Sequence, residues 1–110
     1  MKRCEIYEVY FDPIIGSEQG GRRPAVIISG NLANDNLKTV IVCPMTSKLK
    51  NYHGNLILNP NEKNGLNKKS EVMSIHVRAI AKQRIRKKIG KVSLTEMNII
   101  VESLNKILRY

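Results

Sequence analysis

Residues 16–29 read GSEQGGRRPAVIIS, a glycine-rich polar segment that changes abruptly into an apolar run. The glycines favour a flexible loop that exposes backbone N–H groups. Residues 25–28 are all apolar and do not alternate, which predicts a strand buried on both faces. Pro24 fixes its own φ and pushes Arg23 toward an extended conformation, so these two residues are predicted to form the hinge between loop and strand.

The arginines of this stretch suit phosphate binding. A guanidinium at the end of a strand, beside free backbone N–H groups, can bind phosphate through two parallel hydrogen bonds. One alternative is a glycine hairpin in which Arg22 and Arg23 are simply solvated. A second alternative for Arg23 is a structural ion pair with Glu18 or another carboxylate.

Short strands and one helix are predicted around this stretch. Besides residues 25–28, the expected strands are residues 5–11, 39–43, 55–59 and 72–80. Residues 30–37 are expected to form a loop or a short helical turn, residues 61–69 a polar loop turning at Gly65, and residues 82–88 a basic linker with room for one helical turn. Ser93 and Glu96 form a capping box that opens a C-terminal helix. Apolar residues three and four apart give this helix a core-facing stripe, made of Leu94, Met97, Ile100, Val101, Leu104, Ile107 and Leu108.

Residues 72–80 alternate cleanly between apolar and polar side chains. The pattern predicts one strand with its apolar residues inward (Met73, Ile75, Val77 and Ala79) and its polar residues on the opposite face (Ser74, His76 and Arg78). His76 and Arg78 would then lie about 6.6 Å apart on one face, a distance that spans neighbouring groups of a nucleotide. The alternative for His76 is a structural role.

Several short strands followed by one helix favour a small α+β fold built on a strongly bent antiparallel sheet or barrel. At 110 residues the chain is expected to form a single domain, residues 1–110. Its core should be aliphatic, because the chain has one Phe and no Trp.

No apolar run approaches membrane-spanning length, so we expect a cytoplasmic protein without a membrane partner.

The net charge of +10 is concentrated in one region of the sequence. Residues 48–91 hold twelve Lys and Arg but only two acids, whereas the rest of the chain is balanced. Such an excess favours a polyanionic partner: a nucleic acid, an acidic protein, or both in turn. Cys4 and Cys43 have no metal-binding or redox spacing and are expected to be reduced, packed thiols. Without a cluster of ligands at metal-binding spacing, neither a metal site nor a cofactor is expected.

Two ordered motifs identify a family resemblance. Residues 16–24, GSEQGGRRP, and residues 40–48, VIVCPMTSK, together resemble the MazF/PemK family of toxin endoribonucleases. The resemblance continues through residues 31–34, 77–78 and 88–91 and into the last helix. It implies an SH3-like antiparallel β-barrel with a C-terminal helix, usually a homodimer. It also implies a small acidic antitoxin as partner and weak DNA binding through the antitoxin complex.

The resemblance further implies a metal-independent, sequence-selective endoribonuclease that cuts single-stranded RNA to 2′,3′-cyclic phosphate and 5′-hydroxyl ends. By the family pattern, Arg23 and Thr46 are the catalytic pair. The alternative for Thr46 is a hydroxyl cap on the loop after Pro44. Further candidate RNA contacts are Ser17, Glu18, Gln19, Arg22, Ser47, Lys48, His76 and Arg78. Simple turn chemistry is the alternative for the first three, and solvation is the alternative for Arg22.

The chain also departs from the family pattern. Ile75 and His76 stand where members commonly carry glutamate and glutamine, Ala81 replaces a common aspartate, and Asn55 aligns with a common histidine. The recognised RNA sequence therefore cannot be transferred from the family. The alternative function is non-catalytic: a gyrase-poison-like or basic nucleic-acid-binding module on the same barrel.

Overall fold

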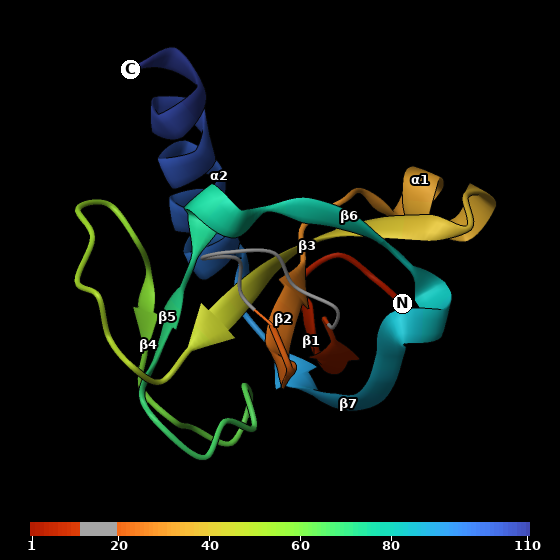
Figure 1. The fold of residues 1–110 in the computed structure, drawn as a ribbon, viewed down its shortest axis with the longest axis horizontal. Helices are drawn as coiled ribbons and strands as arrows, with labels where there is room; N and C mark the ends of the chain where they lie inside the picture. Colours follow the sequence, from red (N-terminus) through yellow and green to blue (C-terminus); the bar gives the residue numbers. More distant parts are fainter. Residues whose placement is uncertain (12–19) are drawn as a thin grey trace.

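A computed structural model describes residues 1–11 and 20–110 as a strongly curled antiparallel sheet with a helix at the C-terminal end (Figure 1). The predicted site residues Ser17, Glu18 and Gln19 lie outside the described residues. In chain order the elements are β1 (Glu5–Tyr10), β2 (Arg22–Ile27), α1 (Asn31–Asn36), β3 (Thr39–Thr46), β4 (Ile57–Leu58), β5 (Ser70–Val72), the 3₁₀ turn η1 (Ser74–His76), β6 (Arg78–Ala81), the 3₁₀ turn η2 (Lys82–Arg84), β7 (Ile85–Lys91) and α2 (Leu94–Arg109).

Strand β3 organises the sheet. The strand order is β4-β5-β3-β2-β1-β7, with β6 also paired to β3, and each of these pairs is antiparallel. The first half of β3 pairs with β6 and its last two residues pair with β5, so one long strand holds two separate segments (Figure 1). The predicted α+β class, a small bent antiparallel barrel with a C-terminal helix, is confirmed.

The curled sheet carries apolar side chains on both faces. One cluster contains Ile6, Val26 and Cys43 and packs against Met97 and Ile100 of α2. A second cluster is formed by Val9, Phe11, Ala25, Ile27, Val40, Val42 and Ile80. Strand β2 contributes Val26 to the first cluster and Ala25 and Ile27 to the second, which confirms the two-sided burial predicted from its unbroken apolar run. The apolar run of β3 is buried on both faces only toward its end, because Ile41 is 42% exposed.

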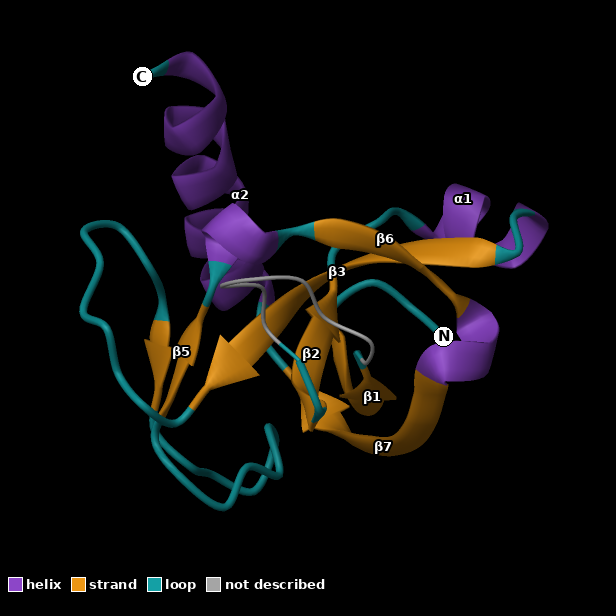
Figure 2. Cartoon of the chain, viewed as in Figure 1, coloured by secondary structure: helices purple, strands orange, loops and turns teal. Residues whose placement is uncertain are grey.

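Helix α2 begins with the predicted capping box. Ser93 Oγ accepts a hydrogen bond from the Glu96 N–H (3.1 Å), and the Glu96 carboxylate accepts one from the Ser93 N–H (2.8 Å). The predicted stripe is correct only near the middle of the helix, because Leu94 and Leu108 are 71% and 80% exposed. Figure 2 shows the reason for Leu108: the end of α2 extends beyond the sheet. No helix among the described residues is long and apolar enough to cross a membrane.

The predicted strand over residues 72–80 is wrong. The segment consists of the end of β5, the turn η1 and most of β6. Pairing shows why: Met45 and Val42 are three residues apart on β3, whereas their partners Val72 and Arg78 are six apart. Turn η1 accommodates the three extra residues and interrupts the alternation. Ser74 is consequently buried and Ile75 is exposed, the opposite of the prediction.

The predicted basic linker over residues 82–88 is also largely wrong. One 3₁₀ turn, η2, is present, but strand β7 begins at Ile85 and pairs with β1. The register between β1 and β7 is irregular at two places, and such bulges disturb the periodicity that marks a strand. The basic side chains of residues 86–88 therefore lie on a sheet strand.

The loop before β5 packs tightly against β7. Gly65 has φ +64°, which confirms the predicted turn. A Cβ on Gly90 would lie 2.4 Å from the Lys63 carbonyl oxygen, so only glycine allows this backbone approach. The Lys91 N–H donates to the same carbonyl (2.9 Å), and the buried Asn64 side chain accepts from the N–H groups of Asn61 and Leu66. These contacts fix the loop as a wall of the cleft described next.

Candidate nucleic-acid cleft

A cleft of about 680 Å³ lies where β1, β2, the end of β3, β7 and the loop before β5 meet. Strands supply most of its floor, which gives its side chains well-defined positions. Its lining consists of Glu8 from β1, residues 22–24 from β2, residues 45–48 at the end of β3, residues 65–68 and Ser70, and residues 87–89 from β7.

The cleft is strongly basic. Six of its lining residues are cationic, namely Arg22, Arg23, Lys48, Lys68, Lys87 and Lys88, and one is a carboxylate, Glu8. Four of the six cations come from residues 48–91, the region whose charge excess predicted a polyanionic partner. The sequence did not identify Lys68, Lys87 or Lys88 individually, because their convergence depends on how β7 and the loop before β5 pack together.

Arg23 is held in place from two sides. Its Nε donates to the Gly20 carbonyl oxygen (2.8 Å), and its Nη1 donates to the carbonyl oxygen of Met45 in β3 (3.3 Å). The hinge predicted at Arg23 and Pro24 is wrong: β2 begins at Arg22, and both residues lie inside the strand. The extended geometry that Pro24 imposes fits a strand, where Arg23 pairs with Val9 and Pro24 with Glu8.

Thr46 is the last residue of β3 and lines the same cleft as Arg23. Its hydroxyl oxygen accepts a hydrogen bond from the Lys48 N–H (3.1 Å). The capping role considered from the sequence is therefore present. This hydrogen bond fixes the hydroxyl at the end of β3, one residue after Met45, whose carbonyl Arg23 contacts.

Glu71 anchors the loop that follows Thr46. Its buried carboxylate accepts hydrogen bonds from the N–H groups of Lys50 (2.7 Å), Asn51 (2.8 Å) and Tyr52 (3.0 Å) and from Asn55 Nδ2 (2.8 Å). Burial opposes ionisation, but these four donors outweigh it and lower the pKa of Glu71. Glu71 also pairs with Thr46 across β3 and β5.

Sequence reasoning did not identify Glu71 as a site residue. The available signal is a single carboxylate in the otherwise uncharged run 70–75, SEVMSI, where a buried charge requires several donors. Asn55, noted as a departure from the family pattern, is one of those donors. Its Oδ1 also accepts a long hydrogen bond from Ser103 of α2 (3.5 Å), which connects the helix to the loop.

The remaining predicted contacts divide into two groups. Arg22, Ser47 and Lys48 are exposed and line the cleft. His76 and Arg78 do not line it: His76 lies in η1, and the Arg78 guanidinium lies over the Phe11 ring, 5.6 Å from its centre. The prediction that they share one face of a continuous strand is wrong, because His76 belongs to the turn η1 and Arg78 to strand β6.

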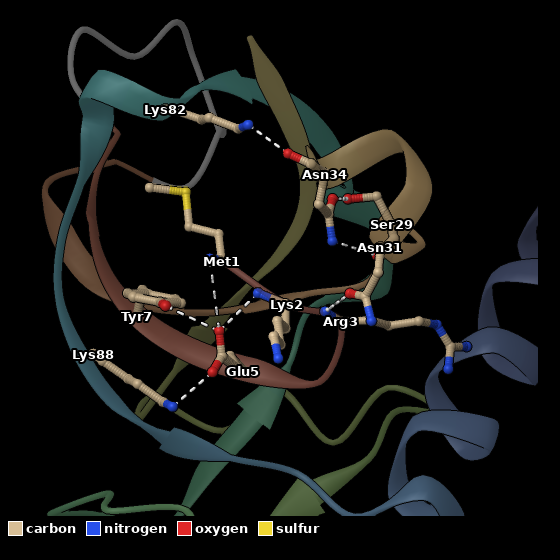
Figure 3. A network of polar contacts seen from close by, with 10 residues as sticks. All are labelled: Met1, Lys2, Arg3, Glu5, Tyr7, Ser29, Asn31, Asn34, Lys82 and Lys88. Atoms are coloured by element: carbon tan, nitrogen blue, oxygen red, sulfur yellow. Dashed lines mark hydrogen bonds and ion pairs between the residues drawn. The ribbon is translucent and has the colours of Figure 1, made fainter. Parts of the chain in front are cut away.

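Lys88 at the edge of the cleft is held by an ion pair (Figure 3). Its Nζ lies 2.6 Å from a Glu5 carboxylate oxygen, and the other oxygen accepts from the Lys2 N–H (2.7 Å) and the Tyr7 hydroxyl (3.0 Å). Burial opposes ionisation of Glu5, but these donors prevail and lower its pKa to about 2. Burial and the same carboxylate raise the pKa of Tyr7 to about 12. Glu5 thus positions one cleft lysine from the neighbouring strand.

Neither cysteine lies in the cleft. Cys4 and Cys43 are free and buried, which confirms the expectation of packed thiols, and burial raises the pKa of Cys43 to about 12. Among residues 1–11 and 20–110, no three His, Cys, Asp or Glu side chains are grouped as metal ligands.

A curled antiparallel sheet with a C-terminal helix is the architecture that the sequence resemblance implied. Residues 2–108 match the family described as PemK-like, MazF-like toxin of type II toxin-antitoxin system, and the chain belongs to this family. It is 32% identical to Endoribonuclease MazF9 of Mycobacterium tuberculosis, covering 94% of this chain and 92% of that protein. It is 35% identical to Endoribonuclease toxin MazF of Escherichia coli K12, covering 88% and 84%.

Solved structures agree with the fold. The crystal structure of MazF (Form-I) from Deinococcus radiodurans matches with a TM-score of 0.86 at 25% identity, over 100% of this chain and 97% of the other. An endoribonuclease in complex with its cognate antitoxin from Mycobacterial species matches with a TM-score of 0.78 at 20% identity, over 98% and 94%. The latter likeness concerns the fold alone.

Proposed function

We propose that this protein, an endoribonuclease toxin of a type II toxin–antitoxin system, cleaves single-stranded RNA in the basic cleft with Arg23 and Thr46 as its catalytic pair. The observation that carries the proposal is the convergence of both residues, from adjacent strands, in a cleft lined by six cations. Relatives that are 30–35% identical over most of the chain are named endoribonucleases, which supports the reaction class.

The proposed step is an attack by the ribose 2′-oxygen on the adjacent phosphorus. The P–O2′ bond forms, the P–O5′ bond breaks, the 2′-hydroxyl loses its proton and the leaving 5′-oxygen gains one. The products are a 2′,3′-cyclic phosphate and a 5′-hydroxyl. Negative charge grows on the non-bridging oxygens, where the Arg23 guanidinium can neutralise it and the Thr46 hydroxyl can donate a hydrogen bond. The cleft lysines would bind the flanking phosphates.

The proposal predicts discrete cuts without added metal. Purified protein incubated with a long single-stranded RNA in EDTA should cut at defined sequences, because Arg23 and Thr46 supply the charge stabilisation. Mapping both ends of the products checks the chemistry, and the Arg23→Ala variant controls for contaminating ribonuclease. An absolute requirement for Mg²⁺ would contradict the mechanism. Binding without any new ends would instead support the non-catalytic module.

The same cleft is proposed to bind the antitoxin. A toxin of this family has an antitoxin partner, and the cleft cations favour an acidic segment that folds on binding. RNA and antitoxin should then exclude each other. In fluorescence anisotropy, adding antitoxin should raise the apparent Kd for a non-cleavable RNA, and an acidic protein of similar charge serves as control. Undiminished RNA affinity in the antitoxin complex would contradict this mode of inhibition.

We also propose that the toxin is a homodimer, as the family resemblance implies. Apolar side chains remain exposed on α2, among them Ile99, which lies off the main helical stripe and is 40% exposed. Covering such residues stabilises an interface. Sedimentation velocity at micromolar concentration should show twice the mass of the 12.5 kDa chain, and a monomer there would refute the proposal.

A further inference from the structure

The cleft contains one carboxylate among its cations, and this residue has no role in the proposed cleavage step. Glu8 lies in the middle of β1, between β2 and β7, and pairs with Pro24. No hydrogen bond or ion pair of its carboxylate is found among residues 1–11 and 20–110. Its neighbour on the same strand, Glu5, is by contrast fully engaged with Lys88, Lys2 and Tyr7.

A carboxylate in this position must face a part of the ligand other than phosphate. Phosphate oxygens carry negative charge and would be repelled by Glu8, whereas the six cations attract them. Glu8 also lies beside the proposed reaction centre. It pairs with Pro24, the residue next to Arg23, whereas strand β2 separates it from the strand that ends at Thr46. From this position Glu8 can contact the base of a nucleotide that flanks the cleaved phosphate.

An ionised carboxylate only accepts hydrogen bonds, which restricts the base it can bind. The Watson–Crick edge of guanine presents a ring N–H and an amino group side by side, and the two carboxylate oxygens can accept from both. Adenine and cytosine place a single amino group next to a ring nitrogen that is itself an acceptor. Uracil places its one ring N–H between two carbonyl oxygens, which would repel the carboxylate. Guanine therefore makes the best match.

We propose that Glu8 is a specificity-determining residue that binds the Watson–Crick edge of a guanine near the cleaved bond. This inference rests on the proposed cleavage of single-stranded RNA and adds the base that is recognised. Single-stranded RNA suits such a contact, because its unstacked bases expose their Watson–Crick edges. Because β1 is paired on both sides, with β2 and β7, its backbone places Glu8 at a defined position in the cleft.

The first experiment compares cut sites of the wild type, Glu8→Gln and the matched control Glu102→Gln. Glu102 is exposed on α2 and does not line the cleft, and its substitution removes the same charge. Wild type and control should share a guanine at one fixed position near the cut. Glu8→Gln should still cut, but its preference for guanine there should fall by about tenfold, because the amide offers one acceptor in place of two. An unchanged preference, no fixed guanine in the wild type, or complete loss of cleavage in Glu8→Gln would overturn the proposal.

A second experiment separates this proposal from cleavage itself. Binding is measured with 2′-O-methyl oligonucleotides, which cannot be cut, that carry guanine or inosine in an otherwise uridine sequence. Inosine retains the ring N–H but lacks the amino group. The wild type should bind the guanine series about tenfold more tightly, and Glu8→Gln should lose most of that difference. Equal guanine-to-inosine ratios in both proteins would refute the role of Glu8. Guanine discrimination in a wild type that cuts no RNA would instead refute the nuclease proposal alone.

Discussion

Replacing Arg23 or Thr46 with alanine should lower the rate of RNA cleavage by about 10²–10³ in each case. Each side chain is expected to stabilise the same developing charge, and it does so only in the transition state. Arg23→Ala removes a guanidinium held by the Gly20 and Met45 carbonyls, and Thr46→Ala removes a hydroxyl held by the Lys48 N–H. Single-turnover cleavage of a mapped RNA site measures the effect directly.

The chain offers matched controls for both substitutions. Arg22 is the adjacent arginine on β2 and lines the cleft, but it is exposed at the rim. Arg22→Ala should mainly weaken RNA binding, in a salt-dependent way, and slow cleavage little at saturating protein. Thr46→Ser keeps the hydroxyl and should retain most activity. Wild-type rates in Arg23→Ala or Thr46→Ala, with folding confirmed by circular dichroism, would refute the assignment of the catalytic pair.

The parts of the fold that depend on local chemistry could be predicted from the sequence. The two-sided apolar run of β2, the capping box of α2 and the turn at Gly65 all follow from short stretches of residues. The segments after Val72 could not be predicted in this way. Their structure depends on how β3 pairs with β5 and β6, and on the irregular pairing of β7 with β1, which local periodicity does not report.

The residues of the candidate site likewise fall into two groups, those that the sequence indicates and those that only the folded structure brings together. Arg23, Thr46 and Lys48 belong to ordered motifs, so the family resemblance indicates them from the sequence alone. Nothing in the sequence distinguishes Lys68 and Lys87 from the other lysines. Only the packing of the loop before β5 against β7 brings them to one cleft. Glu71 could not be predicted for a different reason. Its role depends on three backbone N–H groups from a loop about 20 residues earlier in the chain.

That role makes Glu71 the residue whose replacement should most reduce stability. Glu71→Gln keeps the shape of the side chain but puts an amide NH₂ among groups that are themselves donors. The expected loss is about 2–4 kcal/mol in the free energy of unfolding at pH 7, because buried donors are left without an acceptor. Glu102→Gln, an exposed change of the same charge, should cost less than about 0.5 kcal/mol. Urea unfolding of the three proteins measures both values.

The pH dependence of stability tests whether the Glu71 carboxylate causes the difference between the wild type and Glu71→Gln. Since the pKa of Glu71 is lowered in the folded protein, its ionised form stabilises the fold above the ordinary value of 4.5, and this stabilisation is lost as the pH falls below it. Wild type should therefore lose its advantage over Glu71→Gln progressively below pH 4.5, whereas Glu102→Gln should follow the wild type throughout. Loosening of the loop after Thr46 should also slow cleavage by Glu71→Gln at temperatures where it remains folded. A stability difference that is absent at pH 7, or that does not change on acidification, would contradict the anchoring role of Glu71.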